Sequence, residues 1–226
     1  SEALTADTLG TTSVAIGRSA LKAQNFTTST STYNTAVGFV AGLSVTTGIR
    51  NTLIGAQAGD ALTDADFNVA LGYNTLGSDT LGSHNTAIGY AALFTQNFTT
   101  ATNSYNTAVG SNAGLSVTTG IRNVLLGGLA GDALTDADHN VAIGYQALTS
   151  DTLGSRAIAI GHNALANQNF TTATDSYNVG IGYSAGDAIT TGIFNVLIGG
   201  LAGDAITDAD FNIAVGTNAL STNVLG

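Results

Sequence analysis

The sequence predicts an all-β protein, a parallel β-solenoid (β-roll) in which short strands stack coil upon coil. Three observations predict this fold: a short unit repeats along the whole chain, β-branched and small residues alternate inside each unit, and runs of strong helix formers are missing. The 226 residues include 29 glycines but neither proline nor cysteine. Backbone pairing and apolar packing must therefore hold the fold without disulfides.

The repeating unit closes an apolar tetrad with a glycine, and successive glycines of this kind are 17 or 21 residues apart. The intervals run 21, 17, 17 and 17, so a superrepeat of 72 residues lies over the short unit. We predict twelve coils in a single domain, 1–226, with superrepeats 1–72, 73–144 and 145–216 and a half coil at 217–226. The closing glycines are Gly17, Gly38, Gly55, Gly72, Gly89, Gly110, Gly127, Gly144, Gly161, Gly182, Gly199 and Gly216.

One strand is predicted directly before each closing glycine. The residue before the glycine is always Ile, Val or Leu, and the residue two positions earlier is Val, Ile or Thr, as in Val141-Ala142-Ile143. A small residue usually stands between them. This alternation suits a strand with two different faces, whereas a glycine in every unit would cost a helix about 1 kcal/mol per position.

Two further columns of the repeat predict how a coil turns and how wide its interior is. Asparagine stands four residues before the glycine in ten of twelve units. Because Asn tolerates the left-handed conformation, it suits the corner where the coil bends into the strand, and stacked amides can form a hydrogen-bonded ladder. Alanine stands three residues after the glycine in eleven units, with Thr75 as the exception, which indicates a narrow interior.

The three 21-residue coils carry their extra residues in the related segments AQNFTTSTSTYN, TQNFTTATNSYN and NQNFTTATDSYN. Insertions in a solenoid form loops on one face. Phe26, Phe98 and Phe170 in these loops either form a binding surface or fold their rings onto the coil below. Each segment also contains the N-glycosylation sequon Asn-Phe-Thr, at Asn25, Asn97 and Asn169.

The phrases SVAIGRSAL from Ser13, NTAIGYAAL from Asn85 and NVAIGYQAL from Asn140 resemble the head repeats of trimeric autotransporter adhesins of the YadA type. Similar repeats occur in phage tail fibres. The resemblance covers essentially the whole chain. It implies left-handed coiling, assembly into a homotrimer and a place on the cell surface or on a virion fibre.

Three groups of aspartates are candidate calcium ligands, because carboxylates on loops supply the oxygen atoms that Ca²⁺ prefers. A single coil offers too few ligands, so backbone carbonyls, water, or Asp79 or Asp151 in a neighbouring coil would have to complete such a site. The alternative is an acidic corner, exposed to water, that keeps the chain soluble. The candidates are Asp60, Asp64, Asp66, Asp132, Asp136, Asp138, Asp204, Asp208 and Asp210.

Other classes of function are disfavoured by the sequence. A formal charge of −10 repels nucleic acid and anionic lipid headgroups. The string GLAGD is not followed by Gly-Lys-Ser/Thr, so no nucleotide-binding loop is expected. His84, His139 and His162 appear scattered over different coil positions, and no catalytic set repeats. We therefore expect neither an enzyme nor a cofactor other than calcium.

No apolar run is long enough for a membrane helix, and no leader is recognisable.

The sequence thus predicts a non-catalytic structural subunit of an extracellular fibre or filament, used for stiffness, surface display or adhesion. Its expected partner is another copy of itself, in a homotrimer or a head-to-tail filament, because neither end departs from the repeat as a capping coil would. Surface glycans are a further possible partner. The alternatives are a segment of a phage tail fibre and an ice- or glycan-binding solenoid.

Overall fold

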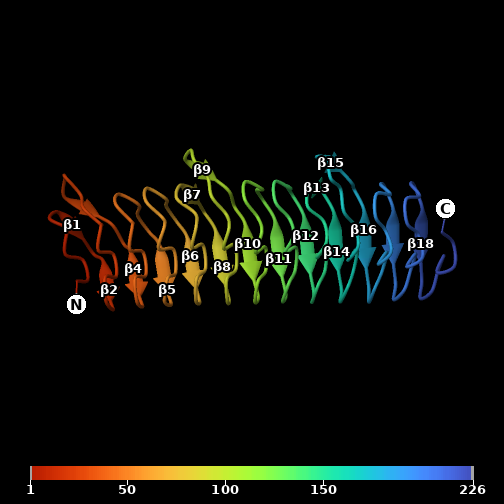
Figure 1. The fold of residues 1–226 in the computed structure, drawn as a ribbon, viewed down its shortest axis with the longest axis horizontal. Helices are drawn as coiled ribbons and strands as arrows, with labels where there is room; N and C mark the ends of the chain where they lie inside the picture. The colour runs from red at the N-terminus through yellow and green to blue at the C-terminus, as the bar shows by residue number, and fades with distance from the viewer. Residues whose placement is uncertain (1, 225–226) are drawn as a thin grey trace. The chain divides into compact units, whose positions relative to one another are not determined.

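A computed structural model describes residues 2–224, so the last two residues of the predicted half coil lie outside the described part. The chain is an all-β parallel β-solenoid of about twelve turns, as predicted, and its described residues form no helix, hence none that could cross a membrane (Figure 1). Two compact units are distinguished, residues 1–111 and 112–226. Whether the chain is a single domain therefore stays a prediction.

The first unit contains six main strands, one per coil, which pair in parallel and in register with the strand of the neighbouring coil. Thr52, for example, lies between Thr35 and Val69. The main strands are β2 (Val14–Ile16), β4 (Thr35–Val37), β5 (Thr52–Ile54), β6 (Val69–Leu71), β8 (Thr86–Ile88) and β10 (Thr107–Val109). Two side pairs accompany the 21-residue coils: β1 (Gly10–Thr11) with β3 (Thr30–Ser31), and β7 (Gly82–Ser83) with β9 (Thr102–Asn103).

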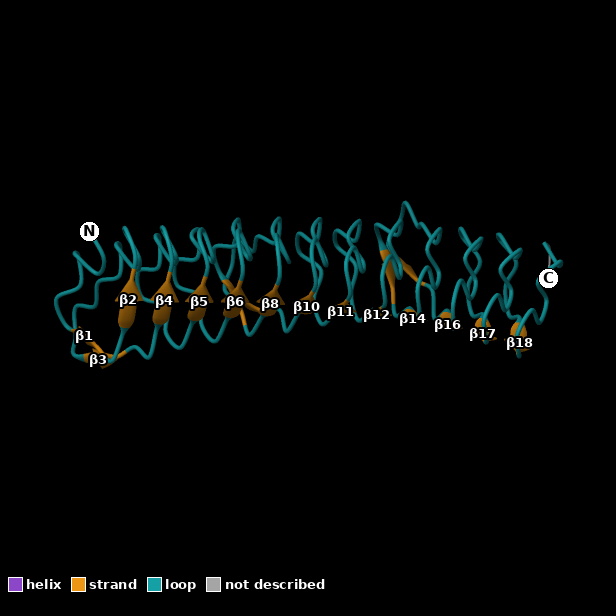
Figure 2. Ribbon diagram, turned by 90° about the horizontal axis from the view of Figure 1, so that it is seen from below, coloured by secondary structure: helices purple, strands orange, loops and turns teal. Residues whose placement is uncertain are grey.

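The second unit repeats this arrangement with six main strands in parallel register. In both units the main strands follow one another along one side of the coils, as Figure 2 shows for β2 to β8. The strands are β11 (Val124–Leu126), β12 (Val141–Ile143), β14 (Ile158–Ile160), β16 (Val179–Ile181), β17 (Val196–Ile198) and β18 (Ile213–Val215). One side pair joins β13 (Gly154–Ser155) to β15 (Thr174–Asp175).

The interior is filled by the middle residue of each main strand and by the alanine column, which are buried except at Ala15 and Ala219 in the end coils. The size of the middle strand residue varies between coils, and the size of the residue that faces it varies in the opposite sense. Where the strand carries Leu53, the positions facing it are Gly42 and Gly59, and a Cβ on either glycine would come within 2.8 Å of a Leu53 methyl. Where the strand carries Ala36, Leu21 occupies the facing position instead and is fully buried. A large residue at one of these positions is thus matched by a small one at the other, as close packing requires.

The closing glycines are required because neighbouring coils approach one another at these positions. Gly38 has φ +145°, and a Cβ there would lie 2.3 Å from the carbonyl oxygen of Gly55. The same contact recurs from coil to coil, for example between Gly127 and Gly144 at 2.4 Å. No side chain fits into this space, so the sequence keeps glycine at these positions.

The predicted asparagine ladder is present in both units, with the amides buried. The backbone N–H of Asn51 donates to Oδ1 of Asn34 at 2.9 Å, and Asn68 donates to Asn51 in the same way at 3.0 Å. Nδ2 of Asn51 also donates to the carbonyl of Ala65. One expectation was wrong: the left-handed residue is not the ladder asparagine but the residue before it, such as Tyr33 with φ 53°. The ladder amide needs an ordinary backbone to point inward.

Candidate interaction surface

The outward face of the main strands carries exposed apolar side chains in each unit. We call it the sheet face and define it as the first and third residues of each main strand, together with the residue before the ladder position and the residue after the closing glycine. Because side chains alternate along a strand, these positions point away from the filled interior. Ile16 and Leu71 in the first unit are 59% and 41% exposed, and Ile198 in the second is 37% exposed.

One edge of the sheet face is a column of stacked rings and guanidinium groups formed by the residue before each ladder position. In the first unit the Arg50 guanidinium lies 5.1 Å from the Phe67 ring centroid. The rings of Phe67 and His84 are 4.7 Å apart, and those of His84 and Tyr105 are 5.0 Å apart. The left-handed backbone at each of these residues directs the side chain outward, and the register of the coils then stacks the side chains.

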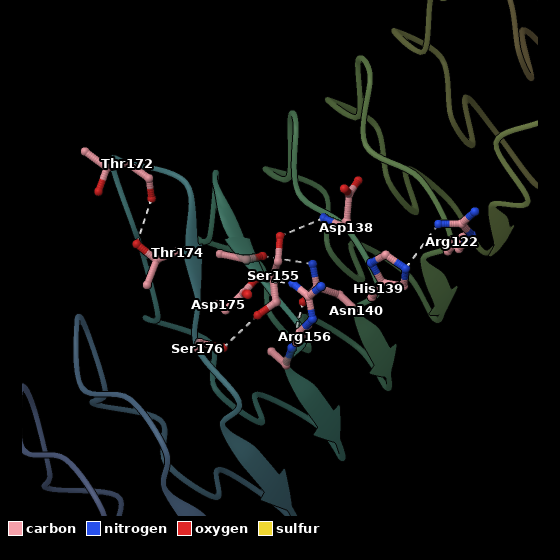
Figure 3. A network of polar contacts seen from close by, with 12 residues as sticks. Arg122, Asp138, His139, Asn140, Ser155, Arg156, Thr172, Thr174, Asp175 and Ser176 are labelled. Carbon is pink, nitrogen blue, oxygen red and sulfur yellow. Dashed lines mark hydrogen bonds and ion pairs between the residues drawn. The ribbon is translucent and has the colours of Figure 1, made fainter. Parts of the chain in front are cut away.

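In the second unit the same column begins with Arg122, whose guanidinium lies 3.4 Å from the His139 ring nitrogen Nε2. Figure 3 shows Arg156 further along, in an ion pair with Asp175 of the long loop. The Arg156 guanidinium also lies 5.9 Å from the Tyr177 ring.

Beyond Arg156 the column consists of rings alone. The Tyr177 and Phe194 rings are 5.3 Å apart, and the Phe194 and Phe211 rings are 5.0 Å apart. The stacked faces cover one another, so the column presents mainly ring edges to solvent.

The opposite edge of the sheet face carries shorter stacks at the residue after the closing glycine. Arg18 lies over Phe39 at 5.7 Å, and Tyr73 stacks on Tyr90 at 5.7 Å. In the second unit His162 lies between Tyr145 and Tyr183, at 5.5 Å from each ring. The sheet face is therefore an apolar strip with aromatic and cationic edges, and no pocket is found among the described residues.

Most of the candidate calcium ligands accept hydrogen bonds from neighbouring coils. Oδ1 of Asp66 accepts the backbone N–H of Ile49 at 2.7 Å, and Oδ1 of Asp64 accepts the Thr47 hydroxyl at 2.6 Å. In the later superrepeats Asp138 and Asp136 make the equivalent bonds to Ile121 and Thr119, and Asp210 makes the one to Ile193. Asp208 accepts from the hydroxyl of Thr207.

The remaining candidates, Asp60, Asp132 and Asp204, lie at one position of the repeat. Burial raises the pKa of Asp60, whose Oδ1 is buried without a partner, as is Oδ1 of Asp204. Asp132 accepts the Thr149 hydroxyl at 2.5 Å, and burial raises its pKa as well. Within residues 2–224, no three His, Asp or Glu side chains gather as a metal site would require. Calcium binding stays a prediction.

A buried polar network in the long coils escaped the sequence analysis, which had considered Asp79 and Asp151 as additional calcium ligands. Asp79 is fully buried, and its Oδ2 accepts from Nε2 of Gln96 at 2.5 Å while Oε1 of Gln96 accepts from Nδ2 of Asn106 at 2.8 Å. Oδ1 of Asp79 accepts the backbone N–H groups of Gly82 and Phe98. The signal was present in the sequence, because Asp-Thr-Leu-Gly recurs 17 residues before Gln-Asn-Phe in each superrepeat.

The same network recurs around Asp151, Gln168 and Asn178. Burial raises the pKa of Asp79 and of Asp151, although hydrogen bonds from glutamine and backbone N–H groups act in the opposite direction. Each of these hydrogen bonds to the two carboxylates comes from a donor. The network therefore fastens the long loop to the coil below it and presents no reactive group to solvent.

Phe26, Phe98 and Phe170 fold onto the coil below, the second of the two expected arrangements, since each is 5–7% exposed. The histidines were described incorrectly at the sequence level: His84 and His139 both precede a ladder position, and only His162 lies elsewhere. None of the three contacts a carboxylate in the described hydrogen bonds.

Comparison with the profiles of known protein families, with curated proteins and with solved structures gives no significant match. The fold and the sheet face are therefore the findings on which a functional proposal has to rest.

Proposed function

We propose that the chain is a non-catalytic structural segment of an extracellular fibre, and that it associates with further copies of itself through the sheet face. The observation that carries this proposal is the apolar strip itself, which no described element of either unit covers. Exposed apolar patches of this extent typically mark interaction sites. Every coil adds the same kind of surface, which suits an extended contact better than a single catalytic cleft.

The size of the sheet face supports association. Six coils at about 4.8 Å each, with about 20 Å of chain across the face, give roughly 600 Å² per unit. A standard interface takes about 800 Å² from each partner, so one unit alone comes close to that value. The flanking Tyr, Phe and Arg residues are the types that are enriched in protein interfaces.

The resemblance to YadA-type head repeats and to phage tail fibres supports an extracellular or virion location. In those proteins such repeats belong to fibres, and a homotrimer with left-handed coils is what the resemblance favours here. A head-to-tail filament is the alternative form of self-association, and it would use the ends of the coil stack and not the sheet face. The two assemblies differ in mass and in outline, so measurement separates them.

Ice or glycan binding is supported less well. Thr occupies the first strand position in four of six coils of the first unit, at Thr35, Thr52, Thr86 and Thr107, but Val or Ile occupies this position throughout the second unit. A threonine lattice therefore does not extend over both units. The stacked rings at the edges cover their own faces, which are the surfaces that a sugar ring would need.

Sedimentation velocity of the purified chain over a range of concentrations, with negative-stain electron microscopy, tests the proposal. We expect oligomers in the wild type and weaker association in Leu71→Lys and Ile198→Lys, which place a charge on the sheet face of each unit, whereas filaments that persist in both variants would indicate end-to-end association instead. Thr100→Lys, on an exposed loop away from this face, is the matched control and should associate normally. A wild-type chain that stays monomeric at every concentration would contradict self-association.

A further inference from the structure

The three Asn-Phe-Thr sequons occupy equivalent places in the fold, at the start of each long loop. Asn25, Asn97 and Asn169 are exposed, and so are the threonines two residues later, Thr27, Thr99 and Thr171. The phenylalanine between them is buried. The repeat copies both the motif and its surroundings, so what bears on function is that both polar members of the motif face solvent in this structural position.

Each sequon asparagine is held by its oxygen and leaves its nitrogen available. Oδ1 of Asn97 accepts the Thr80 hydroxyl at 3.0 Å, and Oδ1 of Asn169 accepts the Thr152 hydroxyl at 3.1 Å. Asn25 accepts from Thr8 in the same way at 3.2 Å. Among the hydrogen bonds of residues 2–224, none comes from Nδ2 of these three side chains. The contact therefore fixes the side chain with Nδ2, the atom that N-glycosylation modifies, free of the described protein.

The loop around each sequon is well anchored. The Phe98 carbonyl accepts the Thr80 hydroxyl at 2.8 Å, and the Phe98 N–H donates to the buried Asp79. The Phe170 carbonyl and N–H make the same contacts with Thr152 and Asp151. The sequon thus sits on a fixed corner, and the residues beyond it up to the side strand form the exposed part of the loop.

The ladder asparagines lack the sequon for a structural reason. Two residues after each ladder asparagine comes the middle strand residue, which points into the narrow interior and is Ala, Leu or Gly. Ser or Thr is therefore absent where a glycan would be impossible, and the motif occurs only where the asparagine is exposed. No other asparagine in the sequence stands two residues before Ser or Thr.

We propose that Asn25, Asn97 and Asn169 are acceptor sites for N-linked glycans. A transferase would join Nδ2 to the anomeric carbon of an oligosaccharide carried on a lipid pyrophosphate. The bond from that carbon to the phosphate oxygen breaks, the lipid pyrophosphate leaves, and Nδ2 loses one proton to the transferase base. The proposal of these three acceptor sites does not depend on self-association through the sheet face.

The position of the loops makes the glycans compatible with that self-association. In the first unit β7 and β9 lie at the opposite end of the coil from the main strands β6 and β8 (Figure 1), and in the second unit β13 and β15 lie opposite β12 and β14. Glycans at the long loops would add a hydrophilic cover on this side and leave the sheet face of each unit free.

Secretion of the chain, behind an added leader, from a eukaryotic cell line that performs N-glycosylation tests the proposal by intact mass. We expect up to three glycans, removed by peptide N-glycosidase with conversion of each modified Asn to Asp. Asn25→Gln, Asn97→Gln and Asn169→Gln should each remove one glycan, and Thr99→Ala should remove the glycan at Asn97 while Thr99→Ser keeps it.

Asn167→Gln is the matched control, because Asn167 is exposed two residues before Asn169 but lies outside a sequon; it should leave all glycans in place. A secreted wild-type chain with unmodified mass would overturn the proposal. A glycan that persists in the triple Gln variant would also overturn it, because the modification would then lie at other residues. Circular dichroism of each secreted variant verifies that the β-solenoid is retained.

Discussion

The carboxamide oxygen of Asn85 accepts the backbone N–H of Asn106, one coil further along the chain, at 3.1 Å. It also accepts the Ser104 hydroxyl at 2.8 Å. In the second unit the equivalent position is Ala157, whose backbone N–H donates to Oδ1 of Asn140 but which offers no side-chain oxygen to the next coil. Ser176 there donates only to the Ser155 carbonyl. The ladder is therefore interrupted at one rung.

This difference predicts opposite effects of two substitutions. Asn85→Ala should lower the free energy of unfolding by about 1 to 3 kcal/mol, because it leaves a buried N–H without an acceptor. Ala157→Asn should raise it by about 1 kcal/mol, because the missing acceptor is restored in a nearly identical coil. Urea unfolding followed by circular dichroism measures both. A loss of stability in Ala157→Asn would show that the second unit lacks space for the amide.

The buried carboxylates predict that the chain is more stable in mild acid than at neutral pH. Burial raises the pKa of Asp79, Asp151, Asp60, Asp132 and Asp187. A carboxyl group with a raised pKa in the folded chain stabilises most below its unfolded pKa of about 3.9, and this stabilisation is lost as the pH rises through the folded pKa.

Two groups act in the opposite direction. Burial alone would raise the pKa of Asp7, but hydrogen bonds from Gln24 and the backbone together lower it, and Lys22 lowers the pKa of Glu2. Asp7 and Glu2 are fewer and more exposed than the buried carboxyl groups. We therefore expect the midpoint temperature of thermal unfolding to decrease as the pH is raised from about 4 to about 7 at constant ionic strength. A midpoint that rises steadily over this interval would contradict the prediction.

The direction of the hydrogen bonds around Asp79 predicts that a second substitution can restore stability lost by a first one. Asp79→Asn should destabilise by about 1 to 3 kcal/mol, because its amide nitrogen would face the donor Nε2 of Gln96. Adding Gln96→Glu should recover part of the loss, because the new carboxylate accepts from the introduced amide at position 79 and from Asn106. Thermal unfolding of the single and double variants decides this. Equal losses in both would show that the charge must reside at position 79.

Two neighbouring glycines predict how closely the coils approach. Gly199 has φ +131°, and a Cβ there would lie 2.6 Å from the Gly216 carbonyl group, whereas a Cβ on Gly200 meets nothing within 4 Å. Gly199→Ala should therefore cost at least about 2 kcal/mol. Gly200→Ala should be neutral or stabilise by up to about 1 kcal/mol, because it restricts the unfolded chain. Denaturant midpoints of the two variants provide the comparison.

The aspartates on the corners predict a test that separates hydrogen bonding from calcium binding. If Oδ1 of Asp138 serves as an acceptor for the Ile121 N–H, Asp138→Asn should unfold like the wild type and Asp138→Ala should lose about 1 kcal/mol. Added Ca²⁺ or a chelator should then leave the melting temperature unchanged. A rise in melting temperature with Ca²⁺ that disappears in Asp138→Asn would instead support the calcium site.

The coil, its strand and its ladder followed from the sequence, because each rests on one residue type in a fixed column. Ala142 between Val141 and Ile143 specifies a strand with one inward residue, and Asn140 specifies the ladder beside it. The stacked column at the edge was missed because its members, such as Arg50, Phe67 and His84, differ in type. They share only a left-handed backbone and an outward direction, which no composition reveals. The Asp79 network was missed because an aspartate is normally assigned to the surface.

The asparagine ladder has a direction, and this direction bears on how the chain folds during synthesis. Each rung receives its N–H from the coil made after it, as when Asn51 donates to Asn34. A completed coil therefore presents the carboxamide oxygen of its ladder asparagine to the segment that emerges next from the ribosome. Ladder bonds join residues only 17 or 21 positions apart, so assembly can advance vectorially, each completed turn serving as the template for its successor.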